Sequence, residues 1–480
     1  MLILQEQRAC RRKVNRYFGF QAPAIHRLGG LGWLSTKRKA REDAEAFARE
    51  LLSTYANRSI SRRPPYPMDH EALTAFAHTF SYRETPDQLR AVHDIEQDLT
   101  GDVPLDRLIA GDVGFGKTEV ALRAAVLAIA AGKQVALLSP TTVLADQHLI
   151  TAKGRFEKLG MRVEALTRLA SKNRQHKIIG DLKEGRIDLL IGTHRILSKD
   201  VAFKNLGLLI IDEEQRFGVR QKEALKNLRA QLDILTLTAT PIPRTLSFAI
   251  SGVRPVSRID IPPAGRQDIE TFVAPWATKL VQKAFEFELS RHGQVYFLHN
   301  HIGTMGRTLE ELQKLTPKAR IDAIHGRMNE TRLSKVMREL RAGQIDILVA
   351  TTIIENGLDL ANVNTLIVEE SSRLGLADAY QLRGRIGRRD KKAYAYFLWR
   401  DTKPRGRAKE RLEALQEATL GGPSTGLGTG GWQIALRDLE IRGAGNILGR
   451  EQSGVANRVG FNLYFHLLAE AVEKLKEHPN

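Results

Sequence analysis

Residues 111–118 read Gly-Asp-Val-Gly-Phe-Gly-Lys-Thr, a pattern that indicates an α/β fold with a nucleotide site. It is a full match to the phosphate-binding loop pattern, in which two glycines, a lysine and a hydroxyl residue have fixed spacing. The apolar run Leu108–Ala110 precedes it and the helix-like Glu119–Ala131 follows it, which is the context that the pattern requires. In such a loop, backbone N–H groups curl around phosphates at the N-terminus of a helix. A chance glycine-rich turn does not explain a full match in this context.

This loop predicts an ATP site with one side chain for the phosphates and one for a metal ion. Lys117 is expected to meet the β and γ phosphates, and Thr118 to ligate Mg²⁺. The residues that we assign to the nucleotide from this stretch are Gly111, Asp112, Val113, Gly114, Phe115, Gly116, Lys117 and Thr118.

Short apolar runs alternate with helical segments on both sides of a central linker. Because the runs are nearly continuous Val, Ile and Leu, they are typical of parallel strands buried on both faces. The first set is Leu108–Ala110, Val135–Leu138, Leu189–Ile191, Leu208–Ile211 and Ile234–Leu237. The second set is Val295–Leu298, Ile321–Ile324, Ile347–Val349, Leu366–Val368 and Ala393–Leu398. We therefore expect two α/β domains of similar size, joined near Ile261–Gly265.

Acidic residues directly follow one of these runs, in Asp212-Glu-Glu-Gln215. Carboxylates at the carboxyl end of a buried strand lie where open α/β sheets bind ligands. Asp212 is expected to hold Mg²⁺ through water, and Glu213 to orient or deprotonate the attacking water. Acidic residues after a strand are usually a surface turn, but the phosphate-binding loop about a hundred residues earlier favours the catalytic interpretation. Thr238 and Thr240, after the next run, are predicted to relay between the ATP site and the bound polymer.

The second half contains a basic block, Gln381-Leu-Arg-Gly-Arg-Ile-Gly-Arg388. Arg385 and Arg388 are three residues apart, which predicts that they share one face of a helix. We interpret them as arginine fingers that reach the γ-phosphate across a cleft. A basic patch that binds backbone phosphates is the alternative. Gly357 and Asp359 mark a second position for nucleotide binding and coupling.

The charge of the chain predicts a polyanionic partner. Its formal net charge is +18 and its pI is near 9.9, which favours nucleic acid or an anionic membrane surface. Half of this charge comes from residues 1–63, where 14 Lys and Arg face 5 Asp and Glu. The single cysteine, Cys10, fits a reducing compartment, and no apolar run reaches the length that spans a bilayer. We therefore expect a soluble cytoplasmic protein.

Both ends of the chain are predicted to be helical. Between Gly30 and Arg63, one apolar stripe lies at spacings of three and four: Ala40, Ala44, Phe47, Leu51 and Tyr55. This segment is either a packing helix or a lever between domains. The tail from Arg405 onward is expected to be helical and to be interrupted by the glycine-rich loop Gly421–Gly431.

Taken in order, these blocks resemble superfamily 2 helicases, and within them the group formed by the transcription-repair coupling factors (Mfd) and RecG. The resemblance covers about Phe80 to Leu468. It implies that Gln88 contacts the base edge of ATP. The segments Pro140–His148 and Gly192–His194, with Thr351–Asp359, would contact the nucleic-acid strand. Its strand-contacting and coupling residues would be Thr142, Gln147, Thr193, His194, Thr352, Arg442 and Gln452.

The C-terminal tail resembles the coupling factors and RecG more specifically than it resembles other superfamily 2 helicases. Asp438–Gly445 and Glu451–Gly454 resemble the translocation motif of this group, which converts lobe closure into movement along duplex DNA. Lys117-Thr-Glu-Val-Ala121 and the leader around Trp33 are more similar to the coupling factors than to RecG. The resemblance thus implies an ATP- and Mg²⁺-dependent translocase on double-stranded DNA that displaces stalled RNA polymerase in DNA repair. A RecG-like remodeller of branched DNA, or an ATP-binding scaffold whose motor is uncoupled, are the alternatives.

The resemblance also implies a division of the chain into tandem RecA-like domains. We expect a leader and linker helix at 1–63, a first RecA-like domain at 64–262, a second at 263–404, and a helical hairpin with a final helix at 405–480. Two features depart from the group: Gln215 replaces its usual histidine, and the loop Gly421–Gly431 is longer and richer in glycine. The barrel that binds RNA polymerase is expected before residue 20, where at most its last strand would fit, so polymerase binding is left open.

Overall fold

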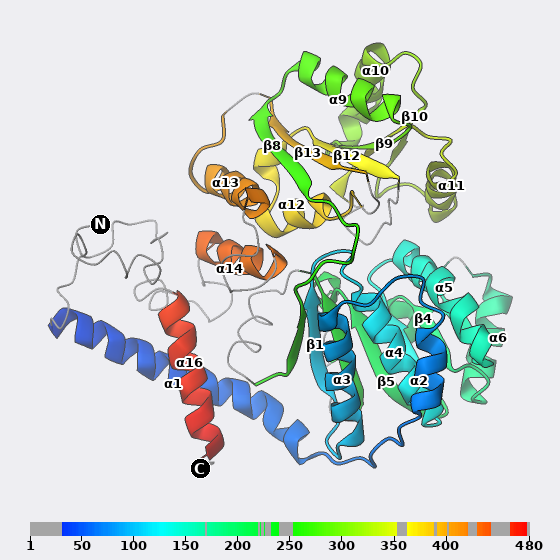
Figure 1. Cartoon of the computed structure of the whole chain (residues 1–480), viewed down its shortest axis with the longest axis vertical. Helices are drawn as coiled ribbons and strands as arrows, with labels where there is room; N and C mark the ends of the chain where they lie inside the picture. The colour runs from blue at the N-terminus through cyan, green and yellow to red at the C-terminus, as the bar shows by residue number, and fades with distance from the viewer. Residues whose placement is uncertain are drawn as a thin grey trace.

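A parallel seven-stranded sheet forms the centre of the first lobe, and a parallel six-stranded sheet forms that of the second (Figure 1). The computed structural model describes residues 31–168, 170–218, 221, 225, 232–239, 253–352, 362–387, 391–400, 403–420, 430–442 and 461–477. The strands of the first sheet follow the order β3-β4-β2-β5-β6-β1-β7, and those of the second follow β10-β11-β9-β12-β13-β8. The predicted α/β architecture with two RecA-like sheets is confirmed.

The first lobe runs from α2 to β7. Its strands are β1 (Asp106–Gly111), β2 (Gln134–Leu138), β3 (Val163–Leu166), β4 (Leu189–Gly192), β5 (Leu206–Asp212), β6 (Asp233–Thr238) and β7 (Val256–Ile259). Its helices are α2 (His70–Ala77), α3 (Pro86–Thr100), α4 (Lys117–Ala130), α5 (Thr142–Phe156) and α6 (Lys172–Lys183), with short 3-10 turns η2 (Glu157–Leu159), η3 (His194–Leu197) and η4 (Glu214–Arg216).

The second lobe runs from β8 to β13. Its strands are β8 (Ile269–Pro275), β9 (Gln294–Leu298), β10 (Ile321–Ile324), β11 (Ile347–Ala350), β12 (Val363–Val368) and β13 (Ala393–Trp399). Its helices are α9 (Thr278–Ser290), α10 (Met305–Leu315), α11 (Glu330–Arg341) and α12 (Leu376–Arg383), with 3-10 turns η5 (Ile302–Thr304) and η7 (Ser371–Arg373). The expected linker Ile261–Gly265 lies between β7 and β8.

Each sheet has a hydrophobic core on both of its faces. In β2, Val135 and Leu137 face one core, while Ala136 and Leu138 face the other. Because side chains alternate along a strand, a strand covered on both sides has apolar residues at every position. This is why the apolar runs were sufficient to predict the central strands.

Three strands were not predicted from the sequence: β3, β7 and β8. All three lie at the edges of their sheets. An edge strand needs less burial, and β7 reads Val-Ser-Arg-Ile, in which two adjacent polar residues interrupt the apolar run. The search for continuous apolar runs therefore missed these strands.

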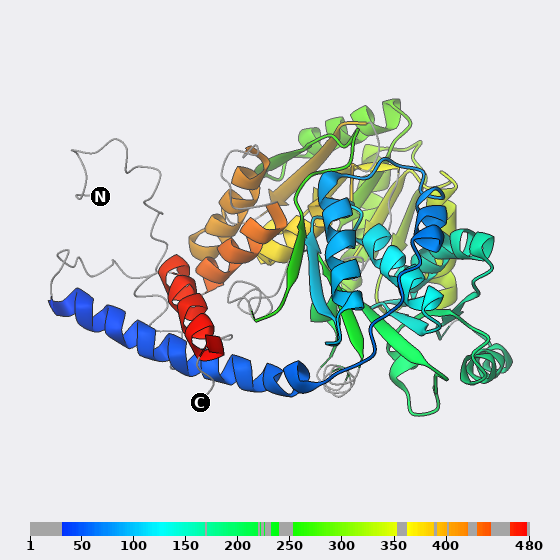
Figure 2. The same ribbon diagram turned by 60° about the horizontal axis from the view of Figure 1, so that its bottom comes forward.

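The two ends of the chain pack against each other. The 30-residue helix α1 (Leu31–Ile60) crosses α16 (Phe461–Glu477), as Figure 2 shows. Ala40, Ala44 and Phe47 of the predicted stripe are buried there with Tyr464 and Leu468. The side chains of Leu51 and Tyr55 lie outside the described residues. The packing interpretation of this helix is therefore confirmed for its described half.

Two further helices, α13 (Gly406–Leu420) and α14 (Gly430–Arg442), pack against each other and against α12 of the second lobe. The start of α14 corrects the prediction of a loop through Gly431, because the helix already includes Gly430 and Gly431. Its first turn also contacts β1 of the first lobe. Among the described residues, no helix is both long and apolar enough to cross a membrane.

Candidate functional site

The phosphate-binding loop joins the end of β1 to the start of α4. Gly114 and Gly116 both have φ of +82°, a left-handed conformation that glycine adopts without steric cost. A Cβ at Gly116 would overlap the side-chain amide of Gln88. Lys117 is buried, and its Nζ donates to the carbonyl oxygens of Gly111 at 2.6 Å and Asp112 at 2.9 Å. The loop is thus a tight cradle with a cationic end.

The side chain of Gln88 contacts the phosphate-binding loop directly. It belongs to a capping box with Thr85 at the start of α3, and its Nε2 donates to the carbonyl oxygen of Phe115 at 2.8 Å. Its side-chain oxygen accepts from the backbone N–H of Thr85 at 3.0 Å. The predicted contact with the base of ATP stays a prediction, but the residue is held in place beside the phosphates' loop.

The acidic pair lies at the end of β5, next to the loop. In the strand order β5-β6-β1, Asp212 is in register with Leu237, and Thr238 with Ala110. Because parallel strands end at the same edge, the sheet brings the carboxylates to the phosphate-binding loop. Thr118, in the first turn of α4, is half-buried at the same edge.

Glu213 is held by three hydrogen bonds in a strained backbone conformation. Its φ is +50°, which is uncommon for a residue other than glycine and which is concentrated at functional sites. Its backbone N–H donates to Leu237 O at 2.9 Å, and its Oε1 accepts from the backbone N–H of Ala239 at 3.2 Å. Gln215 Nε2 donates to its Oε2. The carboxylate is therefore fixed in one orientation.

Ala239 was not predicted as a site residue, although its neighbours Thr238 and Thr240 were. Thr238 is buried, and its hydroxyl has no hydrogen-bond partner within the described part of the chain. The structural link from β6 to Glu213 is thus a backbone N–H, which any residue but proline supplies. No side-chain pattern in the sequence could have revealed it.

His148 is a second residue that sequence reasoning missed. It lies on α5, is buried, and its Nε2 is 3.0 Å from Oδ2 of Asp212. Thr142 and Gln147, the predicted strand-contacting residues, lie on the same helix. The helix therefore connects that predicted surface with the predicted ligand of Mg²⁺.

Arg385 brings charge from the second lobe to this site. Burial lowers the pKa of Lys117, and the positive charge of Arg385 acts in the same direction. Burial raises the pKa of Glu213 and the negative charge of Asp212 adds to this effect, while Lys117 and Arg385 oppose it. Lys117, Asp212, Glu213 and Arg385 thus form one electrostatic cluster across two lobes.

The expected helical placement is wrong for Arg385, and Arg388 lies outside the described residues. Helix α12 ends at Arg383, and Arg385 lies in the turn that follows. The helix has its C-cap at Gly384, and Gly387, with φ of +68°, has a conformation that an α-helix does not accommodate. A turn, rather than a helix face, positions Arg385.

Other contacts also join the lobes near the loop. Arg266, from the segment between β7 and β8, donates to the carbonyl oxygen of Val113 and lies over the ring of Phe115, 4.9 Å from its centroid. Arg216 Nη2 donates to Gln381 Oε1 at 2.6 Å. Neither arginine was assigned a role from the sequence, although Arg216 directly follows the block Asp212–Gln215.

The other residues predicted to contact nucleic acid, Thr193, His194 and Thr352, lie just after the ends of β-strands. Thr193 is buried after β4, with His194 in η3 beside it. Burial and nearby Arg168 lower the pKa of His194. In the second lobe, Thr352 donates from its hydroxyl to Asn300 Oδ1 at 3.0 Å.

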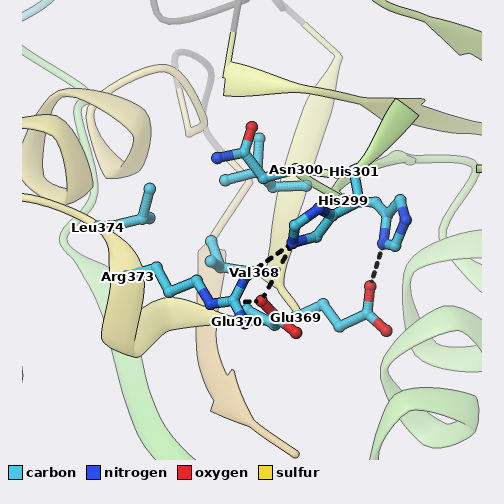
Figure 3. Close-up of a pocket in the computed structure, with 9 residues that line it drawn as sticks. His299, Asn300, His301, Val368, Glu369, Glu370, Arg373 and Leu374 are labelled. Atoms are coloured by element: carbon cyan, nitrogen blue, oxygen red, sulfur yellow. Dashed lines mark hydrogen bonds and ion pairs between the residues drawn. The ribbon is translucent and has the colours of Figure 1, made fainter. Parts of the chain in front are cut away.

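Asn300 lines a pocket at the ends of β9 and β12 (Figure 3). In it, His299 is paired with Glu369 at 2.5 Å, and His301 with Arg373 at 2.7 Å. Sequence analysis did not single out these residues.

Several predicted residues lie outside the described part of the chain. These are Thr240, Gly357, Asp359, Arg388 and Gln452, together with residues 421–429 of the glycine-rich loop. Helix α14 ends at Arg442, and the side chain of Arg442 is also outside the described part of the chain. Their assigned roles stay predictions.

The described residues fit ATP and Mg²⁺. A bound polyphosphate would place negative charge beside Lys117, whose charged form burial otherwise disfavours. The hydroxyl of Thr118 and the carboxylate of Asp212 are hard oxygen donors, which Mg²⁺ prefers. Gly114 and Gly116, which have no side chains, let the loop backbone curl where the Arg266 and Gln88 side chains would meet a Cβ, and such a loop can direct its N–H groups at phosphates.

Two family models match the chain. The DEAD/DEAH box helicase model matches residues 85–248, and the helicase conserved C-terminal domain model matches residues 277–390. Fold and site together define a two-lobed helicase-type protein that hydrolyses ATP.

Individual relatives show which group within this class the chain resembles in sequence. The chain is 48% identical over 467 residues to the transcription-repair-coupling factor of Bacillus subtilis (strain 168), a match that covers 97% of this chain and 39% of that protein. For the Escherichia coli (strain K12) factor, the identity is 46%, with coverage of 96% and 40%. The chain is a homologue of the transcription-repair-coupling factors and spans about two fifths of their length.

Solved structures give the same architecture. RecG bound to a three-way DNA junction is 32% identical, with a TM-score of 0.72 over 91% of this chain and 57% of that one. The helicase Lhr of Mycobacterium smegmatis, bound to single-stranded DNA and AMP-PNP, is 19% identical, with a TM-score of 0.54 over 73% of this chain and 50% of that one. The second likeness concerns the fold alone.

Proposed function

We propose that this chain is an ATP-driven motor that moves along double-stranded DNA. The observation that carries the proposal is that the second lobe meets the nucleotide loop: Tyr380 on α12 donates to Asp112 at 2.5 Å, and Arg385 after that helix adds its charge to the surroundings of Lys117 and Glu213. A site that draws catalytic charge from both lobes is complete only when the lobes are close together. Nucleotide binding and hydrolysis would therefore close and open the lobes.

The chain's own residues supply the chemistry of hydrolysis. Lys117 would hold the β and γ phosphates, and Thr118 and Asp212 would hold Mg²⁺, which neutralises charge on the transferred phosphoryl group. Glu213, oriented by Ala239 and Gln215, would accept a proton from the attacking water.

The second lobe contributes the remaining charge to this reaction. Arg385, with Arg388 as the second predicted finger, would stabilise charge in the transition state.

Alternating closure of the lobes would produce movement if each lobe holds DNA in turn. Thr142, Gln147, Thr193 and His194 in the first lobe and Thr352 in the second are the proposed contacts, and the net charge of +18 favours a phosphate backbone. Arg442 and Gln452 are the proposed coupling residues of the tail.

We propose that the task of the motor is the one indicated by the name of its relatives, which connects transcription with repair. The motor would displace stalled RNA polymerase from DNA, in the cytoplasm. Release of a stalled polymerase from a DNA template tests this task; failure to release it, by a protein that does translocate, would limit the proposal to the motor.

Remodelling of branched DNA is the second candidate, because the RecG likeness covers 91% of the chain. Regression of a model replication fork separates the two. A protein that regresses forks but leaves the stalled polymerase bound would reverse our preference.

The motor itself is tested by ATP turnover with and without linear duplex DNA. We expect stimulation by DNA, and loss of turnover with retained ATP binding in Glu213→Gln. Glu286→Gln, on the exposed side of α9, is the matched control and should behave as wild type. Turnover that ignores DNA, or no turnover at all, contradicts the proposal.

A further inference from the structure

Asp112, the second residue of the phosphate-binding loop, contacts two elements far away in the sequence. Its Oδ2 accepts a hydrogen bond from the hydroxyl of Tyr380 at 2.5 Å, and its Oδ1 accepts one from the backbone N–H of Gly431 at 2.8 Å. Tyr380 lies on α12 of the second lobe, and Gly431 lies in the first turn of α14. One carboxylate thus joins the nucleotide loop to both.

The contact with α14 is close and has a clear electrostatic basis. The first N–H groups of a helix have no partner within the helix, and its N-terminus carries partial positive charge. The Asp112 carboxylate satisfies one of these groups, as an N-cap side chain does, but from another part of the chain. A Cβ at Gly431 would overlap Asp112 Oδ1 and the carbonyl oxygen of Ala239, and a Cβ at Gly430 would overlap the Tyr380 hydroxyl. Only glycines allow this approach.

The contact with the second lobe continues beyond Tyr380. Burial and the neighbouring Asp112 carboxylate raise the pKa of Tyr380, so its hydroxyl stays protonated and remains a donor. Arg383 lies over the tyrosine ring, 4.6 Å from its centroid, and donates to the carbonyl oxygen of Leu415 in α13 at 3.3 Å. Helix α14 therefore contacts Asp112 directly, and α13 is connected to it through Tyr380 and Arg383.

The backbone of Asp112 faces the nucleotide chemistry. Its carbonyl oxygen accepts from Lys117 Nζ at 2.9 Å, so phosphates that attract Lys117 compete with this bond. Ala239, which a side chain at Gly431 would meet, donates its backbone N–H to Glu213. The N-terminus of α14 thus contacts both the phosphate-binding loop and the segment that orients the catalytic carboxylate.

We propose that Asp112 is a positioning residue that couples the nucleotide loop to the second lobe and to α14 through Tyr380 and Gly431. When nucleotide displaces Lys117 from the Asp112 carbonyl, the loop moves, and the carboxylate moves α12 and α14 with it. This inference rests on the proposed function, since it names the residue by which that motor would transmit its nucleotide state.

The primary test is hydrogen exchange of α14 in the full chain, with and without the non-hydrolysable analogue AMP-PNP. In the wild type, we expect AMP-PNP to change the exchange rate of the Gly430–Arg442 amides by about tenfold or more, the effect of one charge-assisted hydrogen bond. Tyr380→Phe removes the hydroxyl that ties the Asp112 carboxylate to α12 and leaves the Asp112–Gly431 bond, so it should weaken this response while AMP-PNP still binds. Tyr394→Phe, on β13, is the matched control and should retain it.

The second measurement is triplex displacement per ATP hydrolysed. Tyr380→Phe and Asp112→Asn should each lower it about tenfold, and the double variant should lower it no further than the more affected single variant, because both substitutions act on the Asp112–Tyr380 contact. An α14 response that is absent in the wild type or intact in Tyr380→Phe overturns the inference. A wild type that shows the α14 response but never displaces a third strand leaves the inference standing and overturns the proposed function.

Discussion

Replacing Gln215 tests the proposed orientation of the catalytic carboxylate. The Gln215 amide donates to Oε2 of Glu213 while the Ala239 N–H donates to Oε1, so Gln215→Ala removes the amide donor to Oε2. A hydrogen bond to a charged group contributes about 1.5–3 kcal/mol. If this is lost in the transition state, turnover falls about 10- to 150-fold.

The same substitution has a consequence for the pH dependence of turnover. Burial raises the pKa of Glu213, and the hydrogen bond from Gln215 lowers it. Without this hydrogen bond the pKa rises further. A base is active only when it is deprotonated, so the acid side of the pH–rate profile should move to higher pH.

Steady-state ATP turnover with saturating duplex DNA, measured across pH, is the assay. Gln215→His is the matched variant, because an imidazole N–H can donate to the same oxygen and should restore most of the turnover. ATP affinity should be unchanged in both variants. If Gln215→Ala keeps turnover within about twofold of wild type and its acid limb does not move, the proposed role of this hydrogen bond is refuted.

Three further predictions follow from the loop, the charge and the second lobe. Gly116→Ala should weaken ATP binding about tenfold or more, because φ is +82° and a Cβ would overlap Gln88; Gly132→Ala, with φ of +74° and open space, is the control and should keep its affinity. Affinity for DNA should fall by about 10³–10⁵ between 50 and 200 mM salt if 6–10 phosphates are contacted, and a flat dependence in a filter-binding titration would contradict backbone contacts. Burial raises the pKa of Glu369, but the hydrogen bond from His299 and the charge of Arg400 outweigh it, so the net pKa is below the ordinary 4.5. Its ionised form therefore stabilises the fold above that pH and stops doing so as the pH falls through the lowered pKa. Glu369→Gln should cost about 1–3 kcal/mol in urea unfolding at pH 7, with the difference from wild type shrinking in acid.

The central strands could be predicted because burial on both faces imposes an apolar residue at every position, as in Val135–Leu138. The edge strand Val256–Ile259 could not be predicted, because the polar residues Ser257 and Arg258 interrupt the apolar run that marks a central strand. The packing of α1 on α16 was also beyond the sequence: the stripe at Ala40 and Ala44 predicted a buried face, but nothing in it identified the partner. Local periodicity predicts that a face is covered, and only the fold shows by what.

The candidate site also has features that the sequence predicts and contacts that only the fold shows. The phosphate-binding loop and Asp212-Glu213 could be recognised because their chemistry needs particular side chains at fixed spacing. The contacts that orient them could not, because they use a backbone N–H at Ala239, a histidine inside a helix at His148, and a tyrosine 268 residues from Asp112. Such partners carry no pattern of their own. The expected helix through Arg385 failed for a local reason, the glycines that end α12.

The most direct test of the central claim is displacement of a fluorescent third strand from a DNA triplex by the purified chain with ATP. We expect the wild type to displace the strand only when ATP is hydrolysed, and Glu213→Gln to bind ATP and DNA but leave the triplex intact. Hydrolysis of ATP by the wild type on the same duplex, without displacement of the third strand, would contradict the claim that this two-lobed ATPase is a motor.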